Sequence, residues 1–199
     1  MADDADRPGA RRRVRNVTAK SLENAALHYL QRFSSSSANL RRVLLRRIER
    51  ARRAEAAVAD GAEAAIDGIV EKFQRLKLID DAAYAAGKAI SLRRRGSSRR
   101  TIGGKLRLAG IEADQIDSAI EAADEELAPA QTSDDGPNAE LRAALRLAER
   151  RRLGPYRPAA ERDERRTRDL AALARAGFGY DIARRVIEAD DPETLLDEP

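Results

Sequence analysis

The chain has 199 residues, of which 42% are hydrophobic, 36% charged and 4% aromatic, and it contains no cysteine. The lack of cysteine excludes a disulfide framework and a thiolate metal site, and no apolar run is long enough to span a bilayer or to form the core of a signal peptide. The abundance of alanine, leucine and arginine favours amphipathic helices over a β-sandwich. We therefore predict an all-α protein located in the cytoplasm.

Apolar side chains recur at helical spacing in nine stretches, and no stretch has the pattern of a strand. Asn39 is the predicted N-cap of the second stretch. The nine stretches are Leu22–Phe33, Leu40–Ile48, Ile66–Phe73, Tyr84–Leu92, Ile102–Ala109, Ile116–Leu127, Leu141–Ala148, Leu170–Ala174 and Ile182–Ala189.

One short pattern occurs twice between these stretches. It reads LRLAGI from Leu106 and LARAGF from Leu173, and each copy is followed by one further helical stretch. We expect Gly110 and Gly177 to end their helices in the left-handed conformation, with the next apolar side chain packing back onto the helix. The spacing of the two copies implies units of three helices stacked in a row.

The predicted domain organisation follows from this spacing. Residues 129–137, PAQTSDDGP, have the composition of a linker. Both ends of the chain are poor in apolar residues and are predicted to be disordered, and Arg11–Arg13 in the first segment would be a non-specific anchor. The predicted parts are a basic segment 1–16, repeat 1 over 17–78, repeat 2 over 79–128, the linker, repeat 3 over 138–190 and an acidic tail over 191–199.

The adjacent carboxylates Asp80 and Asp81 lie at the handover from the third to the fourth stretch. They could belong to a metal or acid–base site, or they could only start a helix. A catalytic or metal site needs further convergent ligands, and the single histidine, His28, lies far away in the sequence. We therefore interpret Asp80–Asp81 as a helix start, with an N-cap carboxylate that accepts first-turn amides.

The stretch LIDDAAYA, from Leu78 to Ala85, resembles the signature of the RecX family of bacterial RecA regulators. Further residues follow in that family's order: Gly96, Ile102, Leu106, Gly110 and Ile111, and later Gly177-Phe178 with Tyr180. The resemblance covers roughly residues 17–190. One departure is that the first unit has no Leu-x-x-x-Gly pattern and instead carries an extended Arg/Ala run from Arg46 to Asp60.

The resemblance implies a binding protein rather than an enzyme. Members of the family consist of three tandem three-helix repeats in an elongated, curved array. They bind RecA, notably its filament on single-stranded DNA, and inhibit its ATPase, strand exchange and coprotease activities. This chain would then moderate recombinational repair and the SOS response. We expect a monomer without cofactor, metal or membrane contact, and weak direct binding to DNA.

The candidate contact residues are basic, because residues 88–107 contain no acid while residues 112–140 contain no base. Guanidinium groups bind carboxylates or phosphates, although such runs are also found on solvated helix faces. Arg150, Arg151 and Arg152 could extend the surface or simply favour a helix C-terminus. Scarce aromatic residues argue against base stacking as the main contact. The main cluster comprises Arg93, Arg94, Arg95, Arg99, Arg100, Lys105 and Arg107.

Other functions are less well supported by the sequence. Gly104-Lys105 lacks the remaining residues of a phosphate-binding loop, and one histidine with no cysteine leaves no nucleophilic triad. The alternative is a helix-turn-helix regulator of duplex DNA acting without RecA, with residues 99–107 in the major groove. Asn and Gln, which read bases, are absent from that segment. A helical scaffold for another protein is a third interpretation.

Overall fold

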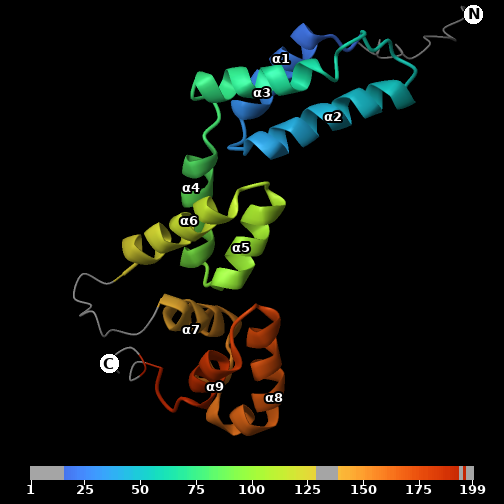
Figure 1. The fold of residues 1–199 in the computed structure, drawn as a ribbon. Helices are drawn as coiled ribbons and strands as arrows, with labels where there is room; N and C mark the ends of the chain where they lie inside the picture. Colours follow the sequence, from blue (N-terminus) through green and yellow to red (C-terminus); the bar gives the residue numbers. More distant parts are fainter. Residues whose placement is uncertain (1–15, 129–138, 193–194, 196–199) are drawn as a thin grey trace, which may run out of the picture. The chain divides into compact units, whose positions relative to one another are not determined.

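The computed structural model describes residues 16–128, 139–192 and 195 (Figure 1). These residues form nine α-helices and one short 3-10 helix, and their only strand-like pairing is an isolated bridge between Val17 and Val58. The prediction of an all-α fold is confirmed. The predicted basic segment with Arg11–Arg13, the linker and the acidic tail lie almost wholly outside the described residues. None of the described helices combines the length and the hydropathy that crossing a bilayer requires.

The chain divides into two compact units, of which the first ends at Ile79. Its helices pack around fully buried side chains that include Leu22, Leu44, Ile66 and Phe73. These helices are α1 (Ala19–Leu30), α2 (Ser37–Arg53) and α3 (Ala65–Arg75).

Two local predictions for the first unit are wrong. The N-cap of α2 is Ser36, whose hydroxyl accepts a hydrogen bond from the Asn39 amide at 3.2 Å, so Asn39 lies inside the first turn. Phe33 was predicted in the apolar stripe of the first helix, but α1 ends at Leu30 and the Phe33 side chain is about half exposed. A serine three residues upstream competes successfully with asparagine because both are strong N-cap residues.

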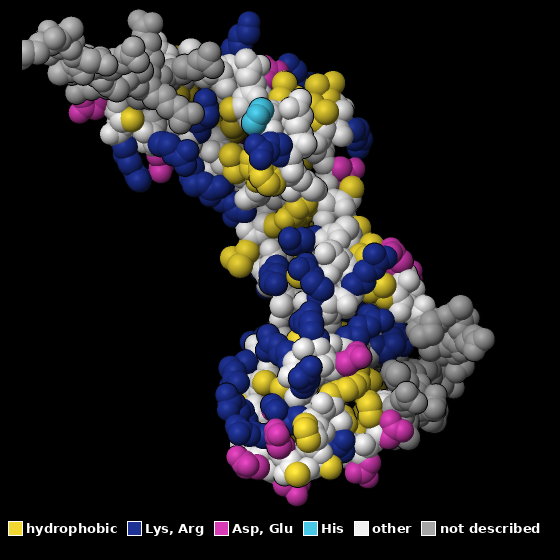
Figure 2. Space-filling model, turned by 180° about the vertical axis from the view of Figure 1, so that it is seen from behind, with side chains coloured by type: hydrophobic (Ala, Val, Ile, Leu, Met, Phe, Trp, Pro, Cys, Tyr) yellow, Lys and Arg dark blue, Asp and Glu magenta, His cyan; other side chains and the backbone are white. Residues whose placement is uncertain are grey.

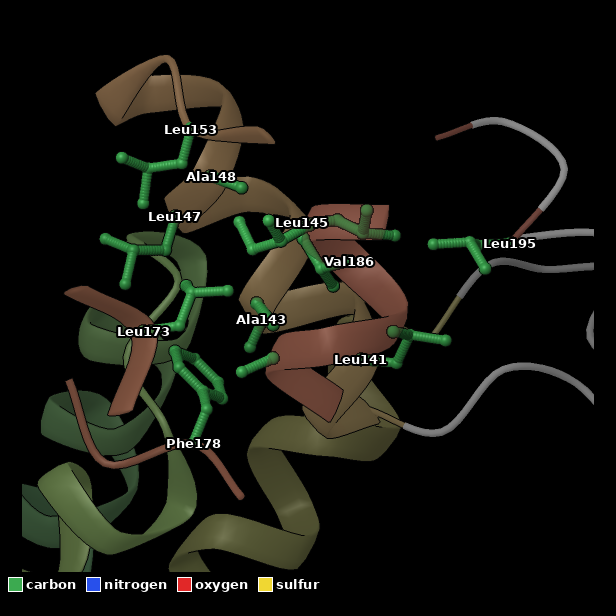
Figure 3. Packing of buried hydrophobic residues seen from close by; sticks show 13 residues of the cluster. Leu141, Ala143, Leu145, Leu147, Ala148, Leu153, Leu173, Phe178, Val186 and Leu195 are labelled. Carbon is green, nitrogen blue, oxygen red and sulfur yellow. The ribbon is translucent and has the colours of Figure 1, made fainter. Parts of the chain in front are cut away.

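The second unit begins at Asp80 and contains two hydrophobic clusters, one within α4–α6 and one within α7–α9. In the latter, Leu173, Phe178 and Val186 turn toward α7 (Figure 3). The predicted boundaries of the three repeats stay a prediction. The elements of this unit are α4 (Asp81–Arg94), α5 (Arg99–Leu108), α6 (Ala113–Glu126), α7 (Ala139–Arg151), η1 (Gly154–Tyr156), α8 (Ala159–Arg175) and α9 (Tyr180–Glu188).

The two predicted glycine stops are confirmed. Gly110 and Gly177 have φ of 80° and 91°. In each case the amide of the next residue reaches back to the carbonyl five residues earlier, as Ile111 does to Leu106 at 3.1 Å. The glycine amides also bond to the carbonyls three residues earlier, those of Arg107 and Ala174, at 2.9 Å. The two bonds at each helix end form the Schellman motif, which satisfies carbonyls that the helix end leaves without partners. Ile111 and Phe178 are both buried, as the pattern predicted.

Three further helix ends use the same motif without glycine. Glu55, Lys77 and Arg152 have φ between 52° and 56°. The amide after each of them bonds to the carbonyl five residues earlier, as Leu78 does to Phe73 at 2.9 Å. The left-handed conformation costs an ordinary residue roughly 1–2 kcal/mol, so these three positions carry strain that glycine would relieve.

We expect Lys77→Gly to raise the free energy of unfolding by about 0.5–1 kcal/mol, since relief of the left-handed strain exceeds the added entropy of the unfolded chain. Urea denaturation followed by circular dichroism measures the change. Lys88→Gly is the matched control, because Lys88 is exposed inside α4 and glycine there should destabilise by about 1 kcal/mol. Destabilisation by both substitutions would contradict the interpretation.

Candidate partner-binding surface

Asp80 is an N-cap, as predicted. Its carboxylate accepts a hydrogen bond from the Ala83 amide at 3.0 Å, and α4 starts at Asp81. Among the described residues, no three His, Cys, Asp or Glu side chains gather in a way that could hold a metal ion. The candidate site is therefore the basic run that begins in the last turn of α4 and continues through α5.

The turn between α4 and α5 is fixed by its contact with α7. Gly96 has φ of 72°, and a Cβ added there would lie 2.7 Å from the Ala143 carbonyl oxygen and from the Leu147 nitrogen of α7. Only glycine allows this approach. The turn between Arg95 and Arg99 therefore rests directly on α7.

The start of α5 is anchored on the end of α8. Ser98 caps α5 by accepting from the Thr101 amide, and its hydroxyl donates to the carbonyl of Ala176 at 2.7 Å. The Thr101 hydroxyl donates to the same carbonyl at 2.8 Å. Gly177, next to that carbonyl, leaves no room for a side chain, since an added Cβ would lie 2.6 Å from the Ser98 hydroxyl. These contacts give the basic residues of α5 a rigid base.

Arg93 lies inside the protein rather than on its surface. Its side chain is 3% exposed. The guanidinium donates to both Asp124 oxygens at 2.6 and 3.0 Å, to Glu140 at 2.6 Å and to the Ser97 carbonyl at 3.0 Å. Burial opposes its charge, but these acceptors outweigh burial and raise the pKa of Arg93 above its usual value. All of its donor groups are directed within the second unit, so Arg93 has a structural role there.

Arg94 and Arg95 are exposed but have internal contacts. The Arg94 guanidinium donates to Glu126 at 2.9 Å, and that of Arg95 to the carbonyl and hydroxyl of Ser91 one turn earlier. Such surface contacts contribute little to the stability of the fold.

Arg99 joins α5 to α6. Its side chain lies 3.1 Å from Asp117 and 3.6 Å from Glu121, and its backbone amide donates to Glu140. The acidic side of α6, which the sequence separates from the basic segment, thus lies beside α5 in the structure.

Three of the predicted cations have no such contacts. Arg100, Lys105 and Arg107 are exposed, and none of them makes an ion pair within the described residues. Arg100 and Arg107 also line an open pocket of about 670 Å³. Ile116 and Ile120 give this pocket an apolar part, and Asp117, Asp124 and Glu140 contribute carboxylates.

The second predicted group of basic residues lies at the C-terminal end of α7. Arg150, Arg151 and Arg152 are exposed and follow Glu140 by roughly 16 Å along the helix axis. Like the first group of free cations, they make no ion pair among residues that the structure describes. Figure 2 shows one face of the second unit, on which Lys and Arg side chains outnumber acidic ones.

Sequence reasoning missed two features. It grouped Arg93 with its exposed neighbours, because nothing in the local sequence separates them. It also missed a basic pocket in the first unit, although the arginines of α2 that line it were visible as the run RRVLLRRIERARR.

Comparison with known proteins gives several matches over most of the chain. No model of a protein family matches. The chain is 42% identical over 180 residues to regulatory protein RecX of Myxococcus xanthus, covering 90% of each chain. It is 28% identical over 178 residues to regulatory protein RecX of Agrobacterium fabrum, covering 88% of this chain and 87% of that one.

Two solved structures share the fold. One is described as the crystal structure of regulatory protein RecX, with a TM-score of 0.54 and 19% identity over 86% of this chain and 72% of that one. The other is RecX from Lactobacillus salivarius, with a TM-score of 0.55 and 19% identity over 85% of this chain and 94% of that one.

Proposed function

Because the chain belongs to the RecX family of regulatory proteins, we propose that it is a negative regulator of RecA. It binds the RecA filament on single-stranded DNA and inhibits the ATPase, strand exchange and coprotease activities of RecA. In this way it moderates recombinational repair and the SOS response. It acts in the cytoplasm as a monomer, by binding and not by catalysis, and needs no cofactor.

The observation that carries the proposed contact site is the group of free cations on α5. Arg100, Lys105 and Arg107 are exposed and lack ion pairs within the described residues, so binding a partner breaks no ion pair at these positions. Arginine binds carboxylates and phosphates through two parallel hydrogen bonds. The pocket beside Arg100 and Arg107 offers a partner apolar contact as well.

The remaining basic residues have graded roles in this proposal. Arg94, Arg95 and Arg99 contribute long-range attraction, because a partner must compete with their internal acceptors. Arg150–Arg152 extend the basic surface. Arg93 supports the surface from inside and does not touch the partner.

The contact favours an acidic protein surface over duplex DNA. The carboxylates Asp117, Glu121 and Asp124 lie along the α6 side of α5, where they would repel the phosphates of a duplex in which α5 occupied the major groove. A helix-turn-helix regulator acting without RecA is therefore the weaker alternative.

The test is the single-strand-dependent ATPase rate of RecA in the presence of the wild-type chain and of an Arg100/Lys105/Arg107→Gln variant. We expect wild type to inhibit below one molecule per RecA monomer, and the variant to need about tenfold more protein, from three exposed contacts of up to about 1 kcal/mol each.

The control is Arg41/Arg52/Arg53→Gln, which removes the same charge from three arginines of α2 that each pair with an acidic residue. It should inhibit like wild type. Equal loss in both variants would contradict the proposed site, because net charge alone would then explain it. Absence of inhibition by wild type would contradict regulation of RecA and direct attention to sequence-preferring duplex binding.

A further inference from the structure

The first unit contains a basic pocket that the α5 surface does not explain. It measures about 380 Å³ and lies between α1 and α2. Tyr29 and Phe33 give it an aromatic part, and no acidic residue lines it, in contrast to the three carboxylates of the pocket in the second unit. Four arginines line it as well: Arg32, Arg46, Arg47 and Arg50. Figure 2 shows hydrophobic and basic side chains around the chain's only histidine, His28, which also lines this pocket.

The aromatic part is exposed and held in place. The Tyr29 and Phe33 rings lie 5.2 Å apart at an angle of 38°. The Tyr29 hydroxyl accepts a hydrogen bond from the Asn39 amide group at 3.1 Å, and that group also donates to Ser35. Phe33 is 52% exposed, and the Arg32 guanidinium lies 5.9 Å from the centre of its ring. A planar ligand can therefore reach the exposed part of the Phe33 ring, while the Tyr29 ring is fixed from behind.

The arginines of α2 fall into two groups by their contacts. Arg41, Arg52 and Arg53 pair with Asp67, Glu63 and Glu49. The pocket arginines of the same helix, Arg46, Arg47 and Arg50, are exposed and make no ion pair in the part of the chain that the structure describes. The pocket is therefore strongly electropositive, and an anionic ligand would displace no acid from it.

We propose that this pocket binds single-stranded nucleic acid. A base stacks on Phe33, while the neighbouring phosphates contact Arg46, Arg47 and Arg50. Every base has a π-face, so this mode needs no particular sequence, and it requires unpaired bases because those of a duplex are stacked on one another. An acidic peptide would satisfy the arginines but would leave the aromatic surface unused.

This site is separate from the α5 surface, and its test omits RecA. Because the chain contains no tryptophan, Phe33→Trp places a single indole reporter in the pocket. Titration with oligothymidylate should quench its emission in a saturable manner. In parallel anisotropy measurements with the labelled oligonucleotide, Phe33→Ala should weaken binding about 5- to 100-fold, the usual effect of losing one stacked base.

Salt dependence separates the phosphate contacts. The Arg46/Arg47/Arg50→Gln variant should reduce the slope of log affinity against log salt by about 2, since each phosphate contact on a single strand contributes about 0.7. Arg41/Arg52/Arg53→Gln, with the same loss of charge on the same helix, should retain most of the affinity. Circular dichroism should show wild-type helicity for all variants.

Three outcomes would overturn the proposal. If Phe33→Ala bound the oligonucleotide as tightly as wild type, no base would be stacked on Phe33. Equal losses from the two arginine triples would indicate diffuse attraction to the chain's net charge. Tighter binding of duplex of the same length, or of polyglutamate, would assign the pocket to a different class of partner. None of these results depends on whether the chain inhibits RecA.

Discussion

Replacing Arg93 with methionine is expected to lower the free energy of unfolding by about 3–5 kcal/mol, the usual cost of removing one partner from a buried ion pair. Methionine keeps much of the side-chain volume but leaves the carboxylates of Asp124 and Glu140, which are only 20% and 22% exposed, without their cation. The Ser97 carbonyl also loses its donor. Urea denaturation of the two proteins at neutral pH measures the difference.

Arg94→Met is the matched control, one residue further along the same helix. Its side chain is 62% exposed and has a single ion pair, with Glu126, so we expect a loss below about 1 kcal/mol. Arg93→Lys should fall between the two, because it keeps the charge but not the two-pronged contact with Asp124. Equal losses in Arg93→Met and Arg94→Met would show that burial of Arg93 contributes nothing special.

Arg93 also connects stability with the proposed function. It joins α4 to α6 through Asp124 and to the start of α7 through Glu140. The Glu140 carboxylate in turn accepts from the Arg99 amide at the first turn of α5. The free cations of α5 are thus held in place by an arginine that is itself buried, and the residues of the basic run do not all have the same role.

Local patterns account for what the sequence predicted well. Helical spacing of apolar residues, the glycine stops at Gly110 and Gly177 and the Asp80 cap each depend on residues within about one turn of one another, so they can be interpreted without knowledge of the rest of the fold. Where a residue other than glycine occupies the left-handed position, as Glu55 does, the same helix stop forms, but the sequence carries no glycine to indicate it. This is why the end of α2 was not predicted.

Long-range contacts account for what the sequence did not reveal. The partners of Arg93 lie 31 and 47 residues away, and its neighbours Arg94 and Arg95 have the same chemistry, so burial could be assigned only from the structure. The overall amino-acid composition also hid a local feature. Aromatic residues are scarce overall, which argued against stacking, yet Tyr29 and Phe33 lie together in one basic pocket.

Replacing Asp169 with asparagine is the second substitution for which we expect a large effect, a loss of about 3 kcal/mol at neutral pH. The Asp169 carboxylate is 2% exposed. It accepts hydrogen bonds from the Gly154 amide at 2.9 Å and from the Arg157 guanidinium at 2.7 and 3.0 Å. An amide group there would direct N–H donors at other donors and leave Arg157 without its counter-ion.

The loss should also depend on pH. Burial alone would raise the pKa of Asp169, but the Arg157 guanidinium and the Gly154 amide outweigh it and hold this pKa below its usual value. Between the folded pKa and the unfolded value of about 3.9, the unfolded chain binds more protons, so stability rises with pH. The contribution is complete above the unfolded pKa and is lost as the pH falls through the folded one.

The difference in unfolding free energy between wild type and Asp169→Asn should therefore be largest near neutral pH and shrink as the pH falls below about 4, because asparagine does not titrate. Urea titrations across this range test the trend. Asp163→Asn, exposed on the same helix α8, should change stability by less than about 0.5 kcal/mol at any pH. A difference for Asp169→Asn that stays constant with pH would mean that packing around Gly154, and not the charge of Asp169, holds η1 against α8.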